Sequence, residues 1–361
     1  MYFSNYRHIV MCACACLVLF GHSSLKAEDW EIEVIDDSTW TGQFTSLALD
    51  GRGNAHISYY DETNRDLKYT YFDGDEWQIE TVDSLNNVGQ YTSLALDVSG
   101  NPHISYFDGT NSDLRYAYFD GDEWQVEVID SVNNVGQYTS LALDGDGNPH
   151  ISYYDATNKD LRYAYFDGSE WQVETADAAN WVGQYTSLAL DSRGQPRISF
   201  WDETNRDLRF AFYEDGWQVE TVESANWVGQ YTSLALDGIG NPHISYWNET
   251  NRALQYTSIT PLLGVWSVQT IDSVNNVGQY TSLALDGDGK PRISYYDDTL
   301  KDLRYAYFDG SEWQTERVDS VGLVGQYTSL ALDTSDYPHI SYYDELNRDL
   351  KYASFDGIAW Q

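Results

Sequence analysis

The chain has 361 residues, with 57 Asp and Glu against 20 Lys and Arg, a formal net charge of −37 and a pI near 4.1. Such an acidic surface repels phosphate backbones and anionic headgroups. The composition therefore excludes a nucleic-acid-binding protein that uses a basic face, and it disfavours binding to anionic membranes. Aromatic residues make up 15% of the chain, far more than disordered acidic segments contain, so we expect a folded protein.

The first 27 residues differ from the rest because they contain no acidic residue. Arg7 and His8 precede an apolar run at 9–20, and a short polar stretch follows that ends at Ala27. This order is typical of a secretory signal peptide. The apolar run of about a dozen residues is short for a membrane span, which needs about 20. We therefore expect residues 1–27 to be a signal peptide, with a retained membrane anchor as the alternative.

All three cysteines lie in the apolar run, so cleavage after Ala27 would leave a mature chain without disulfides, a thiol nucleophile or a cysteine-bound metal. Arg7 and Lys26 leave with the signal peptide, so 18 of the 20 basic residues stay against 57 acidic ones, a net charge of −39. We expect the mature protein, residues 28–361, to be a secreted or periplasmic monomer that does not insert into the membrane and needs no cofactor.

The rest of the chain is built from a repeat of nearly constant length. The phrase Gly-Gln-(Tyr/Phe)-Thr-Ser-Leu-Ala-Leu-Asp occurs seven times, at spacings of 47, 47, 47, 46, 49 and 47 residues. The repeats begin at Gly42, Gly89, Gly136, Gly183, Gly229, Gly278 and Gly325. A fixed period of this length indicates a solenoid or a propeller.

Each repeat contains four short segments rich in aromatic and β-branched residues, which are typical of strands. In the first unit they span 45–50, 56–60, 67–72 and 77–82, and turn residues such as Asp-Gly separate them. No segment has a convincing helical period. Four strands in each of seven units predict an all-β fold, a seven-bladed β-propeller of four-stranded antiparallel blades.

The two ends of the chain predict how the ring closes. Residues 30–36 match the fourth strand of a unit but precede the first complete unit, and the last unit supplies only three strands. We therefore expect strand 30–36 to complete the seventh blade and so to remove exposed sheet edges. Trp360 and Gln361 match the start of a further fourth strand, so a natural protein that continues past Gln361 is an open alternative.

The repeat length, the four-strand unit and the predicted strand exchange resemble the secreted β-propeller repeat proteins, a broad superfamily that includes lectins, Asp-box proteins and integrin-like repeats. The resemblance covers residues 30–361. The turn at 143–150 departs from the Asp-box pattern Ser-x-Asp-x-Gly-x-x-Trp, and no Trp-Asp dipeptide ends the third strands as in WD40 repeats. The resemblance therefore implies the fold and assigns no single family, since many functions share this fold.

The repeat symmetry breaks at two positions whose loops should lie on one face of the propeller. Units four and five carry Trp before the first strand, where three other units carry Asn, and Trp again at the end of the second strand. Flat aromatic faces beside polar groups suit a sugar ring. We therefore predict a carbohydrate site on this face of units four and five, with neutral variation among packing aromatics as the alternative. The predicted site residues are Trp181, Trp201, Trp227, Trp247, Asp202, Asn205 and Asn226.

The patterns that could bind a metal are incomplete. Asp144 with Asp146 and Asp286 with Asp288 resemble partial calcium loops, but three other units lack the second carboxylate. Tight hairpin turns are therefore the preferred interpretation, and calcium in these two units is the alternative. The second-strand histidines align with Arg197 and Arg292 in two units, and arginine cannot replace a zinc ligand. We expect these side chains to pair with neighbouring acids.

The sequence contains little that indicates catalysis. It has no Gly-x-Ser-x-Gly motif, no paired metal-binding histidines and no Gly-rich phosphate loop. Most acids recur in every unit, so no pair of unlike carboxylates stands out. We predict a non-catalytic module that binds carbohydrate. One alternative is a protein-interaction scaffold for an extracellular or cell-surface protein. The other is a propeller glycosidase or polysaccharide lyase with carboxylates such as Asp61 and Asp202 at the channel mouth.

Overall fold

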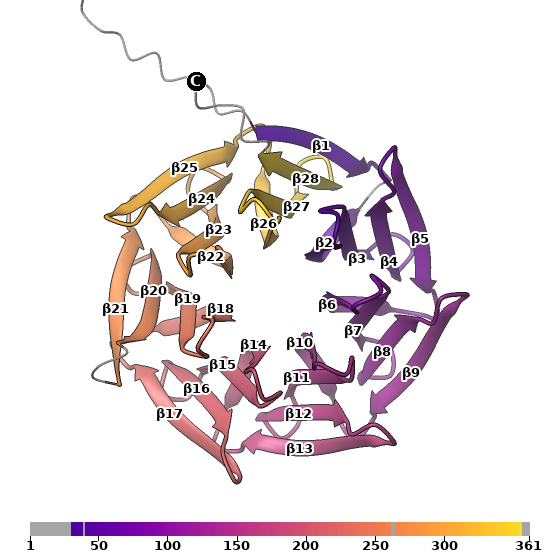
Figure 1. The fold of residues 1–361 in the computed structure, drawn as a ribbon, viewed down its shortest axis with the longest axis horizontal. Coiled ribbons are helices and arrows are strands. Elements are labelled where there is room, and N and C mark those ends of the chain that lie inside the picture. The colour runs from indigo at the N-terminus through magenta and orange to yellow at the C-terminus, as the bar shows by residue number, and fades with distance from the viewer. Residues whose placement is uncertain (1–29, 39, 261–263, 356–361) are drawn as a thin grey trace, which may run out of the picture.

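The computed structural model describes residues 30–38, 40–260 and 264–355, so the predicted signal peptide and Trp360–Gln361 lie outside the described residues. The described residues form 28 strands in seven four-stranded antiparallel sheets around a central axis (Figure 1). The predicted all-β fold, a seven-bladed β-propeller, is confirmed. In the part of the chain that the structure describes, no helix is long and apolar enough to cross a membrane.

The first six blades follow the chain, each from the axis outward. Blade 1 consists of β2 (Thr41–Leu49), β3 (Ala55–Asp61), β4 (Asp66–Phe72) and β5 (Trp77–Asp83), and blade 2 of β6 (Val88–Leu96), β7 (Pro102–Asp108), β8 (Asp113–Phe119) and β9 (Trp124–Asp130). Blade 3 consists of β10 (Val135–Leu143), β11 (Pro149–Asp155), β12 (Asp160–Phe166) and β13 (Trp171–Asp177), and blade 4 of β14 (Val182–Leu190), β15 (Pro196–Asp202), β16 (Asp207–Tyr213) and β17 (Trp217–Glu223). Blade 5 consists of β18 (Val228–Leu236), β19 (Pro242–Asn248), β20 (Ala253–Thr260) and β21 (Val265–Asp272), and blade 6 of β22 (Val277–Leu285), β23 (Pro291–Asp297), β24 (Asp302–Phe308) and β25 (Trp313–Asp319).

Blade 7 joins the two ends of the chain. It consists of β26 (Val324–Leu332), β27 (Pro338–Asp344), β28 (Asp349–Phe355) and β1 (Trp30–Asp36). β1 pairs antiparallel with β28, with Trp30 opposite Phe355, and lies at the outer edge of the blade (Figure 1). The predicted closure of the ring by strand 30–36 is therefore confirmed.

The inner strands start earlier than the sequence predicts, at Thr41 in blade 1 instead of residue 45. Two register shifts, one between Thr41 and Gln43 and one between Gln43 and Ser46, keep the Gly-Gln-Phe segment in the strand. Gly42 has a φ of +94°, and a Cβ there would lie 2.7 Å from the Leu350 Cα of blade 7. The regular recurrence of this glycine along the repeats thus follows from the close approach of neighbouring blades.

Hydroxyl groups join neighbouring blades near the axis. Thr92 Oγ1 donates to Ser58 Oγ in the preceding blade at 2.8 Å, and the Leu94 amide donates to Ser46 Oγ at 3.0 Å. Equivalent Thr–Ser and Leu–Ser bonds occur at all seven junctions between blades. The small serine that the repeat places on the inner strand is therefore a polar link between blades.

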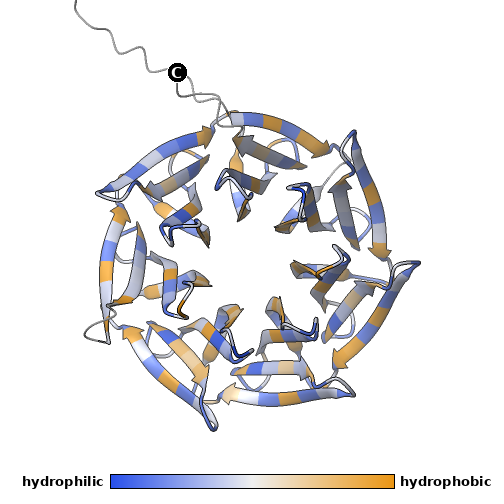
Figure 2. Ribbon diagram, viewed as in Figure 1, coloured by the Kyte–Doolittle hydropathy of each residue, from blue (hydrophilic) through white to orange (hydrophobic). Residues whose placement is uncertain are grey.

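The hydrophobic core lies between the blades. One cluster combines Leu67 and Tyr69 of blade 1 with Val88, Ile104 and Tyr106 of blade 2, and similar clusters occupy the other junctions. Ile104 and Tyr106 have no exposed surface, and burial of each such side chain contributes about 1.5–3 kcal/mol. Apolar and polar residues alternate along the outer strands, as expected for sheets with one buried face (Figure 2).

Candidate ligand-binding sites

The two faces of the propeller carry different loops. We call the face that carries the connections from second to third strands and from each blade to the next the loop face; in blade 1 these are residues 62–65 and 84–87. The opposite face carries the hairpin turns, such as residues 50–54 and 73–76, and we call it the turn face. The predicted tryptophan site belongs to the loop face, and the partial calcium loops belong to the turn face.

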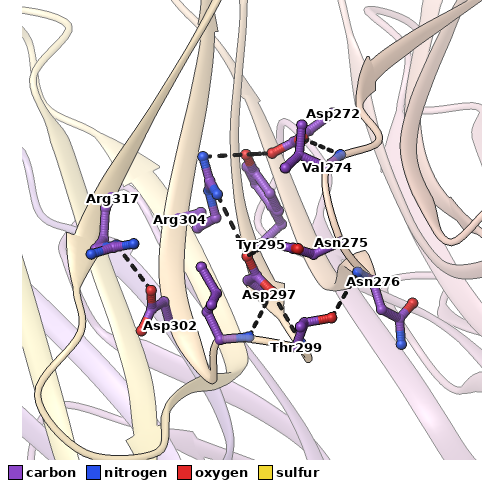
Figure 3. Close-up of polar contacts among 11 residues, drawn as sticks. Asp272, Val274, Asn275, Asn276, Tyr295, Asp297, Thr299, Asp302, Arg304 and Arg317 are labelled. Carbon is purple, nitrogen blue, oxygen red and sulfur yellow. Dashed lines mark hydrogen bonds and ion pairs between the residues drawn. The ribbon is translucent and has the colours of Figure 1, made fainter.

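A buried polar network recurs between neighbouring blades on the loop face, and Figure 3 shows it between blades 5 and 6. The Tyr295 hydroxyl donates to Asp272 Oδ2 at 2.8 Å. The guanidinium of Arg304 lies between Asp272, at 3.7 Å, and Asp297, at 3.5 Å. In blade 2, Arg115 bridges Asp83 and Asp108 in the same way, at 3.1 and 2.8 Å. These acids therefore pair with cations inside the fold, which explains why they recur in the repeat.

The network changes in blades 4 and 5, where the sequence also loses its symmetry. Phe200 replaces the tyrosine in blade 4, and Asp177 Oδ2 has no hydrogen-bond partner among the described residues, although Arg209 lies 3.8 Å away. Burial raises the pKa of Asp177. In blade 5, Gln255 and Asn248 replace the ion pair and bond to each other at 3.0 Å.

Asp61 and Asp202, the carboxylates that the enzyme alternative places at the channel mouth, are buried with exposed fractions of 2% and 0%. Asp61 accepts hydrogen bonds from the amide and the side chain of Asn64. Asp202 accepts the equivalent bonds from Asn205 and a third from Arg209. Both carboxylates are therefore buried and hold their own loops.

The four predicted tryptophans fall into two pairs. Trp201 and Trp247 are buried, with exposed fractions of 5% and 8%, and pack edge-on against Tyr185 and Tyr231 at 6.1 Å between ring centroids. Trp227 is 37% exposed. The first pair thus belongs to the wall around the axis, so that Trp227 and the half-buried Trp181 are the members that a ligand could reach.

Cations cover the two accessible tryptophans. The Lys159 ammonium lies 3.7 Å from the centroid of Trp181, and the Arg206 guanidinium lies 3.8 Å from that of Trp227. Trp181 Nε1 also donates to the Tyr154 hydroxyl at 2.5 Å. These cation–π contacts occupy one face of each ring. Asn205 and Asn226 are exposed near these loops, but Asn205 already donates to Asp202.

The partial calcium loops form capped turns. Asp144 Oδ1 accepts the amides of Asp146 and Asn148 at 2.9 and 2.8 Å, and Oδ2 accepts the Asn148 side chain at 3.0 Å. Asp146 is exposed. In blade 6, Asp286 pairs with Arg292 at 2.7 Å, and the exposed Asp288 pairs with Lys290 at 3.0 Å. The described residues contain no group of three or more His, Cys, Asp or Glu that could hold a metal.

The second-strand arginines pair with acids, as predicted, whereas four of the histidines lie 3.6 to 3.9 Å from an aspartate and bond instead to a tyrosine hydroxyl. His103 lies between Asp97, 3.9 Å from its Nε2, and the Tyr116 hydroxyl, which bonds to its Nδ1. Burial lowers the pKa of His103, and Asp97 only partly offsets this effect, so the ring is neutral at pH 7. Arg197 takes the same place in blade 4 and pairs with Asp191 at 3.0 Å.

The structure contains a set of sites that the sequence does not predict, a row of grooves between neighbouring blades on the turn face. Four of these grooves have volumes of about 170 to 410 Å³. In the groove between blades 1 and 2, blade 1 contributes Tyr71 and Glu80, and blade 2 contributes Asn101, Phe119 and Trp124. The grooves between blades 2 and 3 and between blades 3 and 4 have nearly the same lining.

An indole–carboxylate pair forms one wall of the groove between blades 1 and 2. Trp124 Nε1 donates to Glu80 Oε2 at 2.8 Å, across the boundary between the two blades. Four other tryptophans, Trp77, Trp171, Trp217 and Trp266, donate to glutamates in the same way, and Trp313 donates to Gln269 at 2.9 Å. The Glu80 side chain is half-buried and lines the groove. The pair thus presents an aromatic ring beside a hydrogen-bond acceptor.

Stacked rings form the other wall of the groove. Tyr71 stacks on His56 and on Tyr69, with ring centroids 5.9 and 5.7 Å apart. Burial raises the pKa of Tyr69 well above its usual value, so its hydroxyl stays protonated. Glu80 is the one carboxylate among the lining residues that the structure describes. The groove therefore offers aromatic surface and fixed polar groups, and it lacks the pair of carboxylates that glycoside hydrolysis commonly uses.

The groove between blades 6 and 7 differs from the others. Arg292 takes the place of the histidine, Tyr337 takes the place of Asn101, and the volume is about 410 Å³. Arg292 lies 5.4 Å from the centroid of Tyr307 and pairs with Asp286 at 2.7 Å. The signal that could have identified the grooves is the recurrence of Trp and Glu 44 residues apart, which places them on adjacent blades.

No protein-family model matches the chain, and no curated protein matches it. Solved structures do resemble it. A mutant of AofleA from Arthrobotrys oligospora has 16% identity and a TM-score of 0.56, over 81% of this chain and 90% of that one. The polysaccharide lyase Uly1 has 11% identity and a TM-score of 0.53, over 86% and 88%. The Hadza microbial sialidase Hz136 has 13% identity and a TM-score of 0.50, over 90% and 68%. At identities this low, the structural similarity shows a common fold alone.

Proposed function

We propose that the protein is a non-catalytic carbohydrate-binding propeller that binds sugar rings in the inter-blade grooves of the turn face. The observation that carries this proposal is the recurrence of one groove chemistry at three neighbouring junctions, an indole–carboxylate pair beside stacked aromatic rings. A sugar ring can place its C–H face on an aromatic side chain while its hydroxyls bond to a carboxylate and an amide. The presence of a polysaccharide lyase and a sialidase among the structural neighbours supports a carbohydrate ligand.

Repetition favours binding over catalysis. A ring of similar shallow grooves gains affinity for a multivalent glycan because each further contact becomes intramolecular. Each of the three similar grooves has a single carboxylate among its described lining residues, and its buried tyrosine is held protonated. Export through residues 1–27 belongs to this proposal, since a secreted protein meets extracellular glycans.

The loop face of blades 4 and 5 is the second candidate for the sugar site. Trp227 favours it, because this ring is the most exposed of the four predicted tryptophans and lies beside the exposed Asn226. Two variants separate the two surfaces. Glu80→Gln/Glu127→Gln/Glu174→Gln removes three groove carboxylates, and Gln269 shows that glutamine still accepts the indole hydrogen bond. Trp181→Ala/Trp227→Ala removes the accessible rings of the loop face.

A glycan-array screen of purified residues 28–361 beside these two variants tests the proposal. We expect glycan binding that the triple glutamine variant loses and the tryptophan variant keeps. The opposite pattern would move the site to the loop face. An array without binding would refute the carbohydrate function and favour a protein-interaction scaffold. Release of new reducing or unsaturated ends from a bound polysaccharide would refute the non-catalytic function.

A further inference from the structure

Seven aromatic side chains meet at the propeller axis, one from each inner strand. They are Phe44, Tyr91, Tyr138, Tyr185, Tyr231, Tyr280 and Tyr327, and we call them the axial ring. Neighbouring centroids are 4.6 to 4.8 Å apart, with interplanar angles of 48° to 56°. Together with seven threonines, the axial ring lines a cavity of about 190 Å³.

The geometry of the axial ring follows from the symmetry. Seven blades divide a full turn into steps of about 51°, and the interplanar angles agree with this step, so the ring planes run parallel to the axis. A regular heptagon with edges of 4.7 Å places each centroid about 5.4 Å from the axis. The rings therefore stack side by side like spokes around a narrow passage.

The tyrosine hydroxyls of the axial ring lie near one another. Burial raises the pKa of Tyr185, and the neighbouring Tyr231 and Tyr138 raise it further. Burial and Tyr280 raise the pKa of Tyr327, and Tyr91 also raises it from the other side of Phe44. The hydroxyls of neighbouring blades also bond to one another, as Tyr185 does with Tyr231 and Tyr138. They stay protonated and uncharged at neutral pH.

The threonines that line the same cavity have partners. Thr186 Oγ1 donates to Ser152 Oγ at 2.7 Å, and the other six threonines share equivalent bonds with serines of the preceding blades. Serines thus hold the threonine hydroxyls, and the tyrosine hydroxyls, which bond to neighbouring tyrosines, are the other polar side-chain groups of the cavity. None of the described residues that line it is charged.

The backbone places these seven rings at a conformational cost. Every residue of the axial ring has a φ between 53° and 56°, in the left-handed region that bulky side chains rarely adopt. Each lies in the register shift that precedes the regular part of the inner strand, and such bulges re-aim side chains. Strain of this kind persists where the surrounding structure imposes it and is frequent at ligand sites.

We propose that the axial ring binds a monovalent, weakly hydrated cation of the K⁺ or ammonium type. The net charge of −37 raises the local concentration of cations around the protein. A ring of uncharged oxygens can replace part of the hydration shell of a large monovalent ion, as carbonyl rings do in potassium-selective sites. Calcium instead requires several carboxylates, and none of the described residues lining this cavity supplies one.

Phe44 provides an internal control for this proposal. It occupies the same position as the six tyrosines, at 4.6 and 4.7 Å from its two neighbours, so phenylalanine fits the axial ring without disturbing it. Tyr185→Phe/Tyr280→Phe removes two hydroxyls and should fold normally. Phe44→Tyr adds the missing hydroxyl and completes the ring of seven.

The test measures the thermal midpoint of residues 28–361 in chloride salts of Rb⁺, K⁺, NH₄⁺, Na⁺ and tetramethylammonium at equal ionic strength. We expect Rb⁺, K⁺ and NH₄⁺ to raise the midpoint with a saturable dependence that gives an apparent affinity. Tyr185→Phe/Tyr280→Phe should weaken this affinity about tenfold, as expected for two lost hydrogen-bonding groups, and Phe44→Tyr should strengthen it. Rb⁺ anomalous scattering from crystals should place the ion on the axis.

Two results would overturn the proposal. The first is a cation effect without selectivity: either every cation raises the thermal midpoint equally, or K⁺ raises the midpoints of the protein and of Tyr185→Phe/Tyr280→Phe equally. Either outcome would show general screening of the negative charge. The second is an Rb⁺ position away from the axis. Neither result depends on glycan binding, so the proposed function and the cation site can fail separately.

Discussion

Replacement of Gly183 by alanine tests how closely the blades approach each other near the axis. Gly183 is buried at the start of β14 with a φ of +98°. A Cβ at this position would lie 2.7 Å from the Leu161 Cα and 2.9 Å from the Leu161 nitrogen, both of which belong to the backbone of blade 3. These atoms cannot move without a shift of β12, so the new methyl group must separate two blades.

The expected cost has two parts. A left-handed backbone at a non-glycine residue costs about 1–3 kcal/mol, and crowding of a packed interface costs about 1–3 kcal/mol more. Gly183→Ala should therefore lower the free energy of unfolding by roughly 2–6 kcal/mol. Gly168→Ala is the matched control, because Gly168 has a φ of +94° in an exposed turn, and a Cβ added there would meet no described atom within 4 Å.

Urea unfolding of residues 28–361 and of the two variants measures both parts. Gly168→Ala should show the backbone cost alone, and the further decrease in Gly183→Ala measures the contact between blades. Equal midpoints for the two variants would refute the reasoning, since they would show that the inter-blade contact at 2.7 Å relaxes without cost.

Three further changes probe other parts of the fold. Arg115→Met should lower the free energy of unfolding by about 3–5 kcal/mol, because Asp83 and Asp108 stay buried without a cation. Arg193→Met, which removes an exposed ion pair, is the control and should cost less than about 1 kcal/mol. Similar urea midpoints for the two variants would contradict this difference. Deletion of residues 30–36 removes the strand that completes blade 7, so the thermal midpoint should fall sharply, and an unchanged melting curve would disprove the closure. Burial alone would raise the pKa of Asp191, but hydrogen bonds from Arg193 and from the backbone of Gln195 lower this pKa to about 2. The ionised Asp191 therefore contributes its full stability above pH about 4 and loses it as the pH falls toward 2, so the difference in thermal midpoint between the protein and Asp191→Asn should shrink over that range; a constant difference would count against it.

The features that the sequence determined by itself are those that depend on neighbours in the chain. Alternating side chains and Asp-Gly turns define the four strands of each unit, because the strand period and the turn conformations are local properties. Ring closure was also predictable, since residues 30–36 repeat the pattern of a fourth strand that the last unit lacks. The start of the inner strand was not predictable from the sequence, because Gly42 and Phe44 adopt positive φ values that only the packing of blades imposes.

The candidate sites depend on contacts between blades, and only the tertiary structure decides these contacts. Trp201 and Trp247 break the repeat pattern as Trp227 does, yet the first two are buried against the axial ring and the third is exposed. The reason is that Trp201 and Trp247 lie within the second strands β15 and β19, whereas Trp227 lies in the loop before β18. Trp124 and Glu80 are 44 residues apart in the chain and form one groove wall only because their blades lie side by side. The periodicity of the sequence thus specifies each blade, whereas the relative position of neighbouring blades creates the grooves and the axial ring.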